Sequence, residues 1–123
     1  MPKRILIADD DANLRKVLRY FIESRKACEV CGEAIDGEDA IEKAETLNPD
    51  LIILDYLMPK MNGIDVGAAL KVKQPGVPII LFTGKNIPAL ESAAISVGIR
   101  AVVRKPEMRT LAKHIDILLE ISA

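Results

Sequence analysis

The sequence predicts an α/β protein in which one sheet of five parallel strands carries five helices on its two faces. Short continuous apolar runs, typical of strands buried on both sides, alternate with segments whose apolar residues recur every three to four positions. The alternation begins with a strand and repeats five times. Strand–helix repeats of this kind favour right-handed crossovers, and therefore a parallel sheet covered by helices on both sides.

The first four elements illustrate both patterns. Residues 5–8 form a continuous apolar run, and a weaker strand is predicted over residues 28–35. A helix is predicted over residues 11–25, and another over residues 40–47, which Asn48-Pro49 ends. The apolar positions of the first helix share one face: Leu14, Val17, Leu18, Phe21 and Ile22.

The remaining elements continue the alternation to the end of the chain. Stop signals follow two of the helices, at residues 74–76 and at Gly98. Since the sequence has no linker, internal repeat or low-complexity tract, we expect residues 1–123 to form a single domain. The further elements are, in order, strand 51–54, helix 64–72, strand 77–82, helix 88–97, strand 99–103 and helix 108–119.

Composition excludes several classes of protein. Half of the 123 residues are hydrophobic, 28% are charged and the net charge is −1, which indicates a folded domain rather than a disordered chain. Acids and bases are mixed, so nothing predicts direct nucleic-acid binding or a polybasic membrane anchor. No apolar run approaches the roughly 18–20 residues that cross a bilayer. We expect a soluble, cytoplasmic protein.

Cys28 and Cys31 form a C-x-x-C pattern, which raises redox chemistry or half of a metal site as alternatives. The flanking residues predict a strand, in which residues three apart point to opposite faces. No second pair of Cys or His residues is present to complete a zinc site. We therefore expect two small thiols, buried or half-buried, without a chemical role.

Polar residues stand at the end of each buried strand. Asp9-Asp10-Asp11 follow the first strand, Asp55 the third, Thr83 the fourth and Lys105 the fifth. In a parallel sheet these positions converge on one edge, which is where α/β proteins bind their ligands. A cluster of carboxylates attracts a hard divalent cation with oxygen ligands, such as Mg²⁺. A carboxylate can also act as a nucleophile, and an ammonium and a hydroxyl group can bind phosphate oxygens.

Each residue also has an ordinary structural explanation. Asp11 is a good helix N-cap, and Asp55 could begin a turn. Thr83 is a usual strand residue, and Lys105 could be a solvated surface charge. Because four such coincidences at four strand ends are improbable, the set predicts a site that handles a phosphoryl group with Mg²⁺.

The chain resembles the response-regulator receiver family of two-component signal transduction over nearly its whole length. This resemblance implies a flavodoxin-like, doubly wound sheet with the strand order 2-1-3-4-5. The motifs that carry it are Ile5-Leu6-Ile7-Ala8-Asp9-Asp10, Asp55-Tyr56-Leu57-Met58-Pro59 with Asn62-Gly63, Thr83-Gly84 and Lys105-Pro106.

The resemblance also implies a metal site. Asp10 resembles the acidic residue that ligates Mg²⁺ directly, and Asp9 the residue that assists it through water. Asp55 and the Leu57 carbonyl resemble the further ligands. The expected cofactor is Mg²⁺.

The same resemblance implies roles in phosphorylation. Asp55 resembles the phosphorylated aspartate, Lys105 the lysine that pairs with it and then with the phosphate, and Thr83 the switch hydroxyl. The Lys105-Pro106 peptide bond is expected to be cis. Receivers usually carry Tyr or Phe three residues before this lysine, where the chain has Val102. We therefore expect phosphorylation to be retained and the later signalling step to differ or to be weaker.

Partners follow from the resemblance. A sensor histidine kinase or a histidine phosphotransfer protein would donate the phosphoryl group, and a downstream protein or a fused output domain would respond. The segment 88–97 and the final helix are either a wide buried band or an exposed apolar patch for a target or a homodimer. The apolar residues concerned are Ile87, Leu90, Ala93, Ala94, Ile95, Val97, Ile117 and Ile121. Whether the protein is a stand-alone receiver or part of a longer chain stays open.

Three other functions are possible for an α/β protein with an aspartate at a strand end. A phosphatase of the haloacid-dehalogenase type needs a second Asp two residues after the nucleophile, where the chain has Leu57. A flavin-binding module needs a phosphate loop after the first strand, where Asp9 to Asp11 would repel a phosphate. A scaffold that keeps the fold without phosphorylation is a third alternative. The presence of Asp10, Asp55, Thr83 and Lys105 argues against it, and Val102 argues weakly for it. We expect a signalling switch that assists its own Mg²⁺-dependent phosphorylation and dephosphorylation, and not an enzyme.

Overall fold

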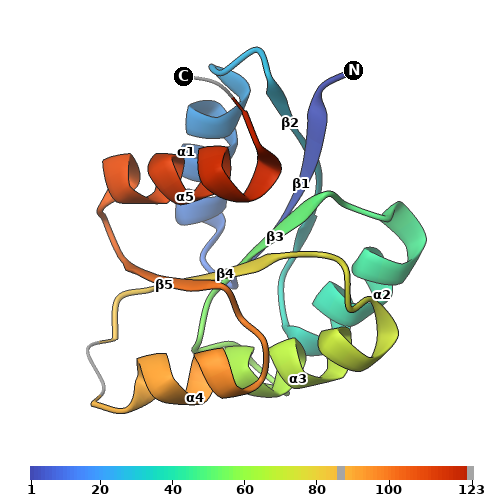
Figure 1. Ribbon diagram of the computed structural model, residues 1–123, viewed down its shortest axis with the longest axis vertical. Coiled ribbons are helices and arrows are strands. Elements are labelled where there is room, and N and C mark those ends of the chain that lie inside the picture. Colours follow the sequence, from blue (N-terminus) through green and yellow to red (C-terminus); the bar gives the residue numbers. More distant parts are fainter. Residues whose placement is uncertain (86–87, 122–123) are drawn as a thin grey trace.

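The chain forms one parallel sheet covered on both faces by helices, as Figure 1 shows. A computed structural model describes residues 1–85 and 88–121. The sheet has the order β2-β1-β3-β4-β5, and each neighbouring pair of strands is parallel. The predicted fold class and strand order are therefore confirmed.

The bounds of the elements agree with the predicted alternation. The strands are β1 (Lys3–Ala8), β2 (Cys28–Ala34), β3 (Leu51–Leu54), β4 (Ile79–Thr83) and β5 (Ala101–Arg104). The helices are α1 (Ala12–Glu23), α2 (Gly37–Leu47), α3 (Gly63–Lys73), α4 (Leu90–Ser96) and α5 (Met108–Leu119).

Local capping explains where several helices begin and end. The side chain of Asp11 accepts hydrogen bonds from the backbone of Asn13 and Leu14, so it caps α1 as the sequence predicts. Asp36 and Asn62 cap α2 and α3 in the same way. The predicted start of the fourth helix at residue 88 is wrong, because Ala89 has a left-handed backbone (φ 70°) that a continuing helix cannot contain.

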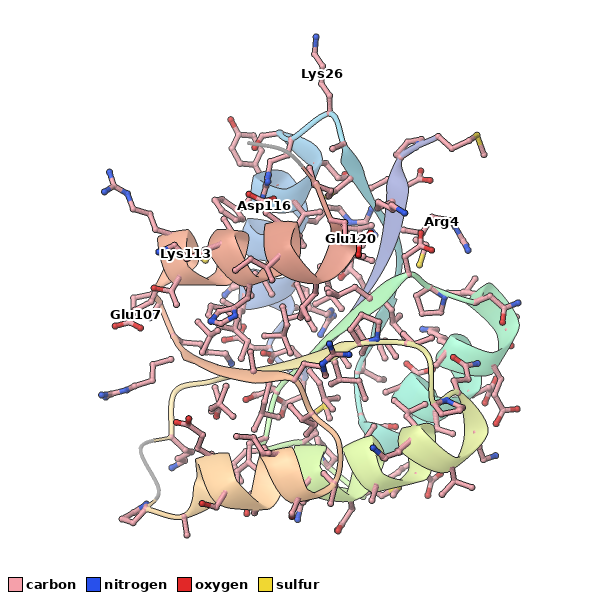
Figure 2. All side chains as sticks on the ribbon, in the orientation of Figure 1. Arg4, Lys26, Glu107, Lys113, Asp116 and Glu120 are labelled. Carbon is pink, nitrogen blue, oxygen red and sulfur yellow. The ribbon has the colours of Figure 1, made fainter. Side chains whose placement is uncertain are left out.

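Two apolar layers sandwich the sheet. In Figure 1, α1 and α5 lie on one side of the sheet, and α2, α3 and α4 lie on the other. Successive residues of β1 point to opposite layers: Ile5 and Ile7 pack on the α1/α5 side, and Leu6 and Ala8 pack on the other. Charged side chains such as Lys26 and Lys113 are exposed, and Figure 2 shows Lys26 pointing outward. Burial on both faces explains the continuous apolar runs.

The two cysteines are free and lie on opposite sides of the sheet. Cys28 is buried in the α1/α5 layer, and the half-buried Cys31 packs against the other layer. Burial raises the pKa of both thiols, which keeps them protonated and poorly nucleophilic. The expectation of two structural thiols agrees with this placement.

The apolar residues of the fourth and fifth helices do not form one exposed patch. Leu90 and Ala94 are buried, whereas Ile95 is exposed. Ile117 is also exposed, but it lines a recess beside Phe21 on the α1 side of α5. Ile87 lies outside the described residues. Within the described chain, no helix is both long and apolar enough to span a membrane.

Candidate functional site

The predicted site residues stand at the carboxyl ends of four strands. Asp9 follows β1, Asp55 follows β3, Thr83 ends β4 and Lys105 follows β5. Asp9, Asp55 and Thr83 are only 2%, 8% and 1% exposed, although the residues around them in the core are almost all apolar. Burying a carboxylate is costly unless it is paired, so these side chains need polar partners.

Lys105 provides the shared partner. Its Nζ lies 2.8 Å from Oδ2 of Asp9 and 3.2 Å from Oδ2 of Asp55. The Lys105 backbone N–H donates to the Thr83 carbonyl at 2.9 Å, which holds the start of the segment after β5 against the end of β4. The Lys105-Pro106 peptide bond is cis, as expected. The structure thus brings one ammonium group between two buried carboxylates.

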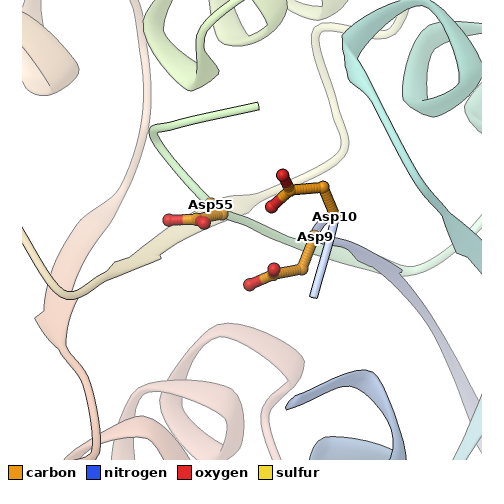
Figure 3. Close-up of side chains that lie close together, drawn as sticks. All are labelled: Asp9, Asp10 and Asp55. Carbon is orange, nitrogen blue, oxygen red and sulfur yellow. The ribbon is translucent and has the colours of Figure 1, made fainter. Parts of the chain in front are cut away.

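Asp10 completes an acidic cluster. One carboxylate oxygen each from Asp9, Asp10 and Asp55 lies within 4.8 Å of the other two (Figure 3). Asp10 is exposed, so this cluster opens to solvent on one side. Its donor atoms are all oxygens of the kind that Mg²⁺ prefers, and the cluster carries more acidic than basic groups. The residues present therefore fit a hard divalent cation.

The electrostatics of the cluster show an excess of negative charge. Burial and the neighbouring Asp9 carboxylate raise the pKa of Asp55, and the Lys105 ammonium only partly offsets this. Burial by itself would lower the pKa of Lys105, but hydrogen bonding and attraction to Asp9 and Asp55 raise it overall. Lys105 therefore stays charged at neutral pH, and the two carboxylates still repel each other.

The loop after β3 fixes the position of Asp55. The Asp55 N–H donates to the Ala8 carbonyl at 3.0 Å, and the Tyr56 N–H donates to Asp55 Oδ1 at 2.8 Å. Gly63 closes the loop by donating to the Tyr56 carbonyl at 2.7 Å. A Cβ atom at position 63 would lie 2.4 Å from the Asp55 carbonyl oxygen, so this approach requires glycine.

A recess of about 280 Å³ lies beside Asp55. Leu57, Thr83 and Lys105 line it, as do Gly84 and Lys85. The Thr83 hydroxyl accepts a hydrogen bond from the Lys85 N–H at 3.2 Å. The sequence reasoning did not include Lys85. Its position two residues after Thr83, in the loop at the same sheet edge, is the signal that points to it.

Val102 is not among the residues that line this recess. It is half-buried on β5, pairs with Leu81 in the sheet register and packs against the α2/α3/α4 layer. It also lines a separate hollow of about 250 Å³ with Leu90 and Glu91 of α4. The effect of Val102 on signalling stays a prediction.

Fold and site together define a class of α/β protein that gathers acids and a lysine at the carboxyl edge of a parallel sheet. The model of the family described as "Response regulator receiver domain" matches residues 5–116, and the chain belongs to this family of two-component signalling proteins. The predicted family is therefore confirmed.

Relatives support the assignment. The chain is 38% identical over 106 residues to the chemotaxis protein CheY of Thermotoga maritima, covering 86% of this chain and 88% of that one. It is 43% identical over 99 residues to a protein-glutamate methylesterase/protein-glutamine glutaminase of Pyrococcus abyssi, covering 75% of this chain. It spans only 27% of that relative's length. The match to this methylesterase is thus confined to a part of it.

A solved structure supports the fold. The crystal structure of the response regulator domain of Thermotoga maritima CheB superposes with a TM-score of 0.89 at 28% identity, and all of both chains is covered.

Proposed function

We propose that Asp55 accepts a phosphoryl group from a phosphohistidine of a sensor kinase or phosphotransfer protein, and that this switches binding to a downstream protein. The observation that carries the proposal is the placement of Lys105 Nζ between Asp9 and Asp55, 2.8 and 3.2 Å from their carboxylates. A purely structural ion pair needs one acid for one base. Here Lys105 faces two acids, Asp9 and Asp55, and Asp10 is a third. A bound cation and a phosphoryl group would explain why the site has more acids than bases.

The transfer balances as a displacement at phosphorus. An Asp55 carboxylate oxygen attacks the phosphorus, an O–P bond forms, and the P–N bond to the donor imidazole breaks. The imidazole nitrogen keeps the electron pair and takes a proton from solvent. Lys105 then pairs with a phosphoryl oxygen instead of the Asp55 carboxylate. The Thr83 hydroxyl, which accepts from the Lys85 N–H before phosphorylation, donates to a second phosphoryl oxygen.

Asp9, Asp10, Asp55 and the Leu57 carbonyl would hold Mg²⁺ at this site. When bound, Mg²⁺ neutralises the charge that the acids and the phosphoryl oxygens bring together. The three carboxylates would supply its acidic ligands, and Asp10, which is exposed, gives the site its opening to solvent.

Phosphorylation of the intact protein tests this function. The protein is incubated with acetyl phosphate and Mg²⁺, and its mass is measured; we expect a gain of one phosphoryl group, prevented by EDTA and by Asp55→Asn. Asp65→Asn is the matched control, because Asp65 is an exposed aspartate in the first turn of α3. A mass gain that survives Asp55→Asn would reject Asp55 as the acceptor. Catalytic release of phosphate from many substrates would favour a phosphatase, and no response would favour a scaffold.

The output surface is proposed to include α4 and β5, with homodimerisation on the α4/α5 side as one form of it. Exposed Ile95 and the hollow beside Val102 support contact there. Val102→Tyr tests how the signal spreads: the variant should show a larger change in amide chemical shifts of α4 on beryllofluoride binding than wild type. Equal changes in the two proteins would argue against a weaker coupling in wild type.

A further inference from the structure

We propose that Arg15 is a positioning residue that fixes the Asp9–Asp10 peptide and thereby directs the Asp10 carboxylate towards the metal site. The inference rests on the proposed function and adds a residue to it. Arg15 lies in the first turns of α1, and its side chain is only 14% exposed. Its Nη1 donates to the backbone carbonyl of Asp9 at 2.7 Å.

The bond to the Asp9 carbonyl controls Asp10 because a peptide unit is planar. The Asp9 C=O and the Asp10 N–H belong to one rigid plane, so a fixed carbonyl direction also fixes the Asp10 Cα. The Asp9 side chain is already held, by the Asp11 N–H at 2.8 Å and by Lys105 at 2.8 Å. Among the described residues, the Asp10 carboxylate accepts no hydrogen bond, so the backbone position of Asp10 decides which places its side-chain rotamers can reach.

Glu33 holds Arg15 in place from the sheet. Arg15 Nε donates to Glu33 Oε1 at 2.9 Å, and Glu33 pairs with Ile7 in the β1–β2 register. The guanidinium is planar, so Nε and Nη1 bind their two partners in a fixed relative geometry. The strand therefore positions Glu33, Glu33 positions Arg15, and Arg15 positions the peptide that precedes Asp10.

Arg19 offers a matched control on the same carboxylate. Its Nε donates to Glu33 Oε2 at 2.8 Å, one helical turn after Arg15, but it makes no bond to Asp9. Arg15→Met and Arg19→Met each remove one positive charge and one ion pair with Glu33 and keep an unbranched side chain. Only Arg15→Met removes the bond to the Asp9 carbonyl.

The sign of the effect separates positioning from simple charge. Loss of a nearby positive charge, by itself, would strengthen Mg²⁺ binding to an acidic cluster. Loss of positioning would weaken it, and groups that orient metal ligands typically contribute 10–100-fold in affinity. For Arg15→Met we expect about tenfold weaker Mg²⁺ binding, despite the lost positive charge. Arg15→Lys, which retains one donor, should recover part of this loss.

The experiment is a Mg²⁺ titration of the full chain, monitored by amide chemical shifts. Urea unfolding and amide hydrogen exchange of the metal-free proteins are measured in parallel. Arg15→Met should bind Mg²⁺ more weakly and exchange the Asp10 and Asp11 amides faster. Arg19→Met should bind Mg²⁺ as tightly as wild type or slightly more tightly and leave the exchange of these amides unchanged, while losing similar stability. Equal affinities of the two variants would overturn the role of Arg15 and leave the proposed function intact. A wild-type protein that binds no Mg²⁺ would overturn both.

Discussion

Two clusters of charge contact Asp9, one through its side chain and the other through its backbone carbonyl, and they have opposite composition. In the strand-end cluster, Lys105 stands between the carboxylates of Asp9 and Asp55. In the second cluster, Glu33 stands between the guanidinium groups of Arg15 and Arg19. The pKa of Asp55 is raised, mainly by burial and by Asp9. Burial would also raise the pKa of Glu33, but the two arginines lower it overall.

The difference separates a site that needs a ligand from one that does not. Around Glu33 the charges balance, because Arg15 and Arg19 both pair with Glu33 and Arg19 also pairs with Glu23. This cluster therefore stabilises the fold and holds a backbone in place. Around Lys105 an acid is left over, and a second cation or a proton would relieve its repulsion. The destabilised cluster is thus the one that we propose to bind Mg²⁺, and the satisfied cluster is the one that supports it. Each prediction below alters one cluster.

The largest effect is expected from removing the shared cation. Lys105→Met leaves Asp9 and Asp55 buried without a counter-charge, and breaking a buried pair of this kind costs about 3 kcal/mol in free energy of unfolding. Urea unfolding in EDTA measures this. The control is Lys73→Met, whose ion pair with Glu45 is about half exposed and should contribute less than about 0.5 kcal/mol. Equal losses in the two variants would show that Lys105 stabilises its buried carboxylates no more than Lys73 stabilises its half-exposed partner.

Mg²⁺ should stabilise the protein through the strand-end cluster alone. A ligand at ten times its dissociation constant raises the free energy of unfolding by about 1.4 kcal/mol. We expect this gain in wild type and its loss in Asp10→Asn. Asp11→Asn is the control, because Asn caps a helix as well as Asp while the neighbouring charge is removed. Equal gains in Asp10→Asn and wild type would contradict ligation by Asp10.

Glu33→Gln should destabilise the satisfied cluster by about 1 kcal/mol, since it weakens two partly exposed ion pairs at once. Glu29→Gln on the same strand is the control, because Glu29 is exposed and its side chain makes no salt bridge among the described residues. Urea unfolding at low and high salt should show the difference shrinking as salt screens the pairs. A stability unchanged by Glu33→Gln would mean that the arginines are held by other contacts.

The sequence predicts the strand-end cluster better than the cluster around Glu33. A parallel sheet brings every strand's carboxyl end to one edge, so the topology alone brings Asp9, Asp55 and Lys105 together. Glu33 and Arg15 meet through long side chains on a strand and a helix. Helical spacing indicates which face of α1 is apolar, but it does not indicate that Arg15 turns back to a carbonyl six residues earlier.

Backbone details escaped prediction for a related reason. Ala89 adopts a left-handed conformation without being glycine or asparagine, so nothing in the composition marks the late start of α4. Ile95 and Ile117 are both exposed and lie outside the buried faces of α4 and α5. They lie on different sides of the molecule, because α5 packs beside α1, where Ile117 lines a recess with Phe21. Helical periodicity describes one element at a time, and these features depend on its neighbours.

The smallest expected effect is a difference in pH dependence between the two clusters. Because the pKa of Asp55 is raised on folding, the native state binds its proton more tightly than the unfolded chain. The stabilisation from this proton is complete below the unfolded pKa, about 3.9, and is lost as pH rises through the native pKa. For Glu33 the pKa is lowered, so its stabilisation is complete above the unfolded pKa, about 4.3, and is lost as pH falls through the native pKa.

Unfolding free energies of wild type, Asp55→Asn and Glu33→Gln, measured in EDTA at constant ionic strength across the acidic range, test this contrast. The stability of wild type relative to Asp55→Asn should fall as pH rises, and its stability relative to Glu33→Gln should rise. Opposite slopes would establish that folding disfavours the ionised form of Asp55 and favours the ionised form of Glu33. Parallel slopes would mean that Lys105 satisfies Asp55 as fully as the arginines satisfy Glu33, and the strand-end cluster would then have no unmet charge to attract a cation.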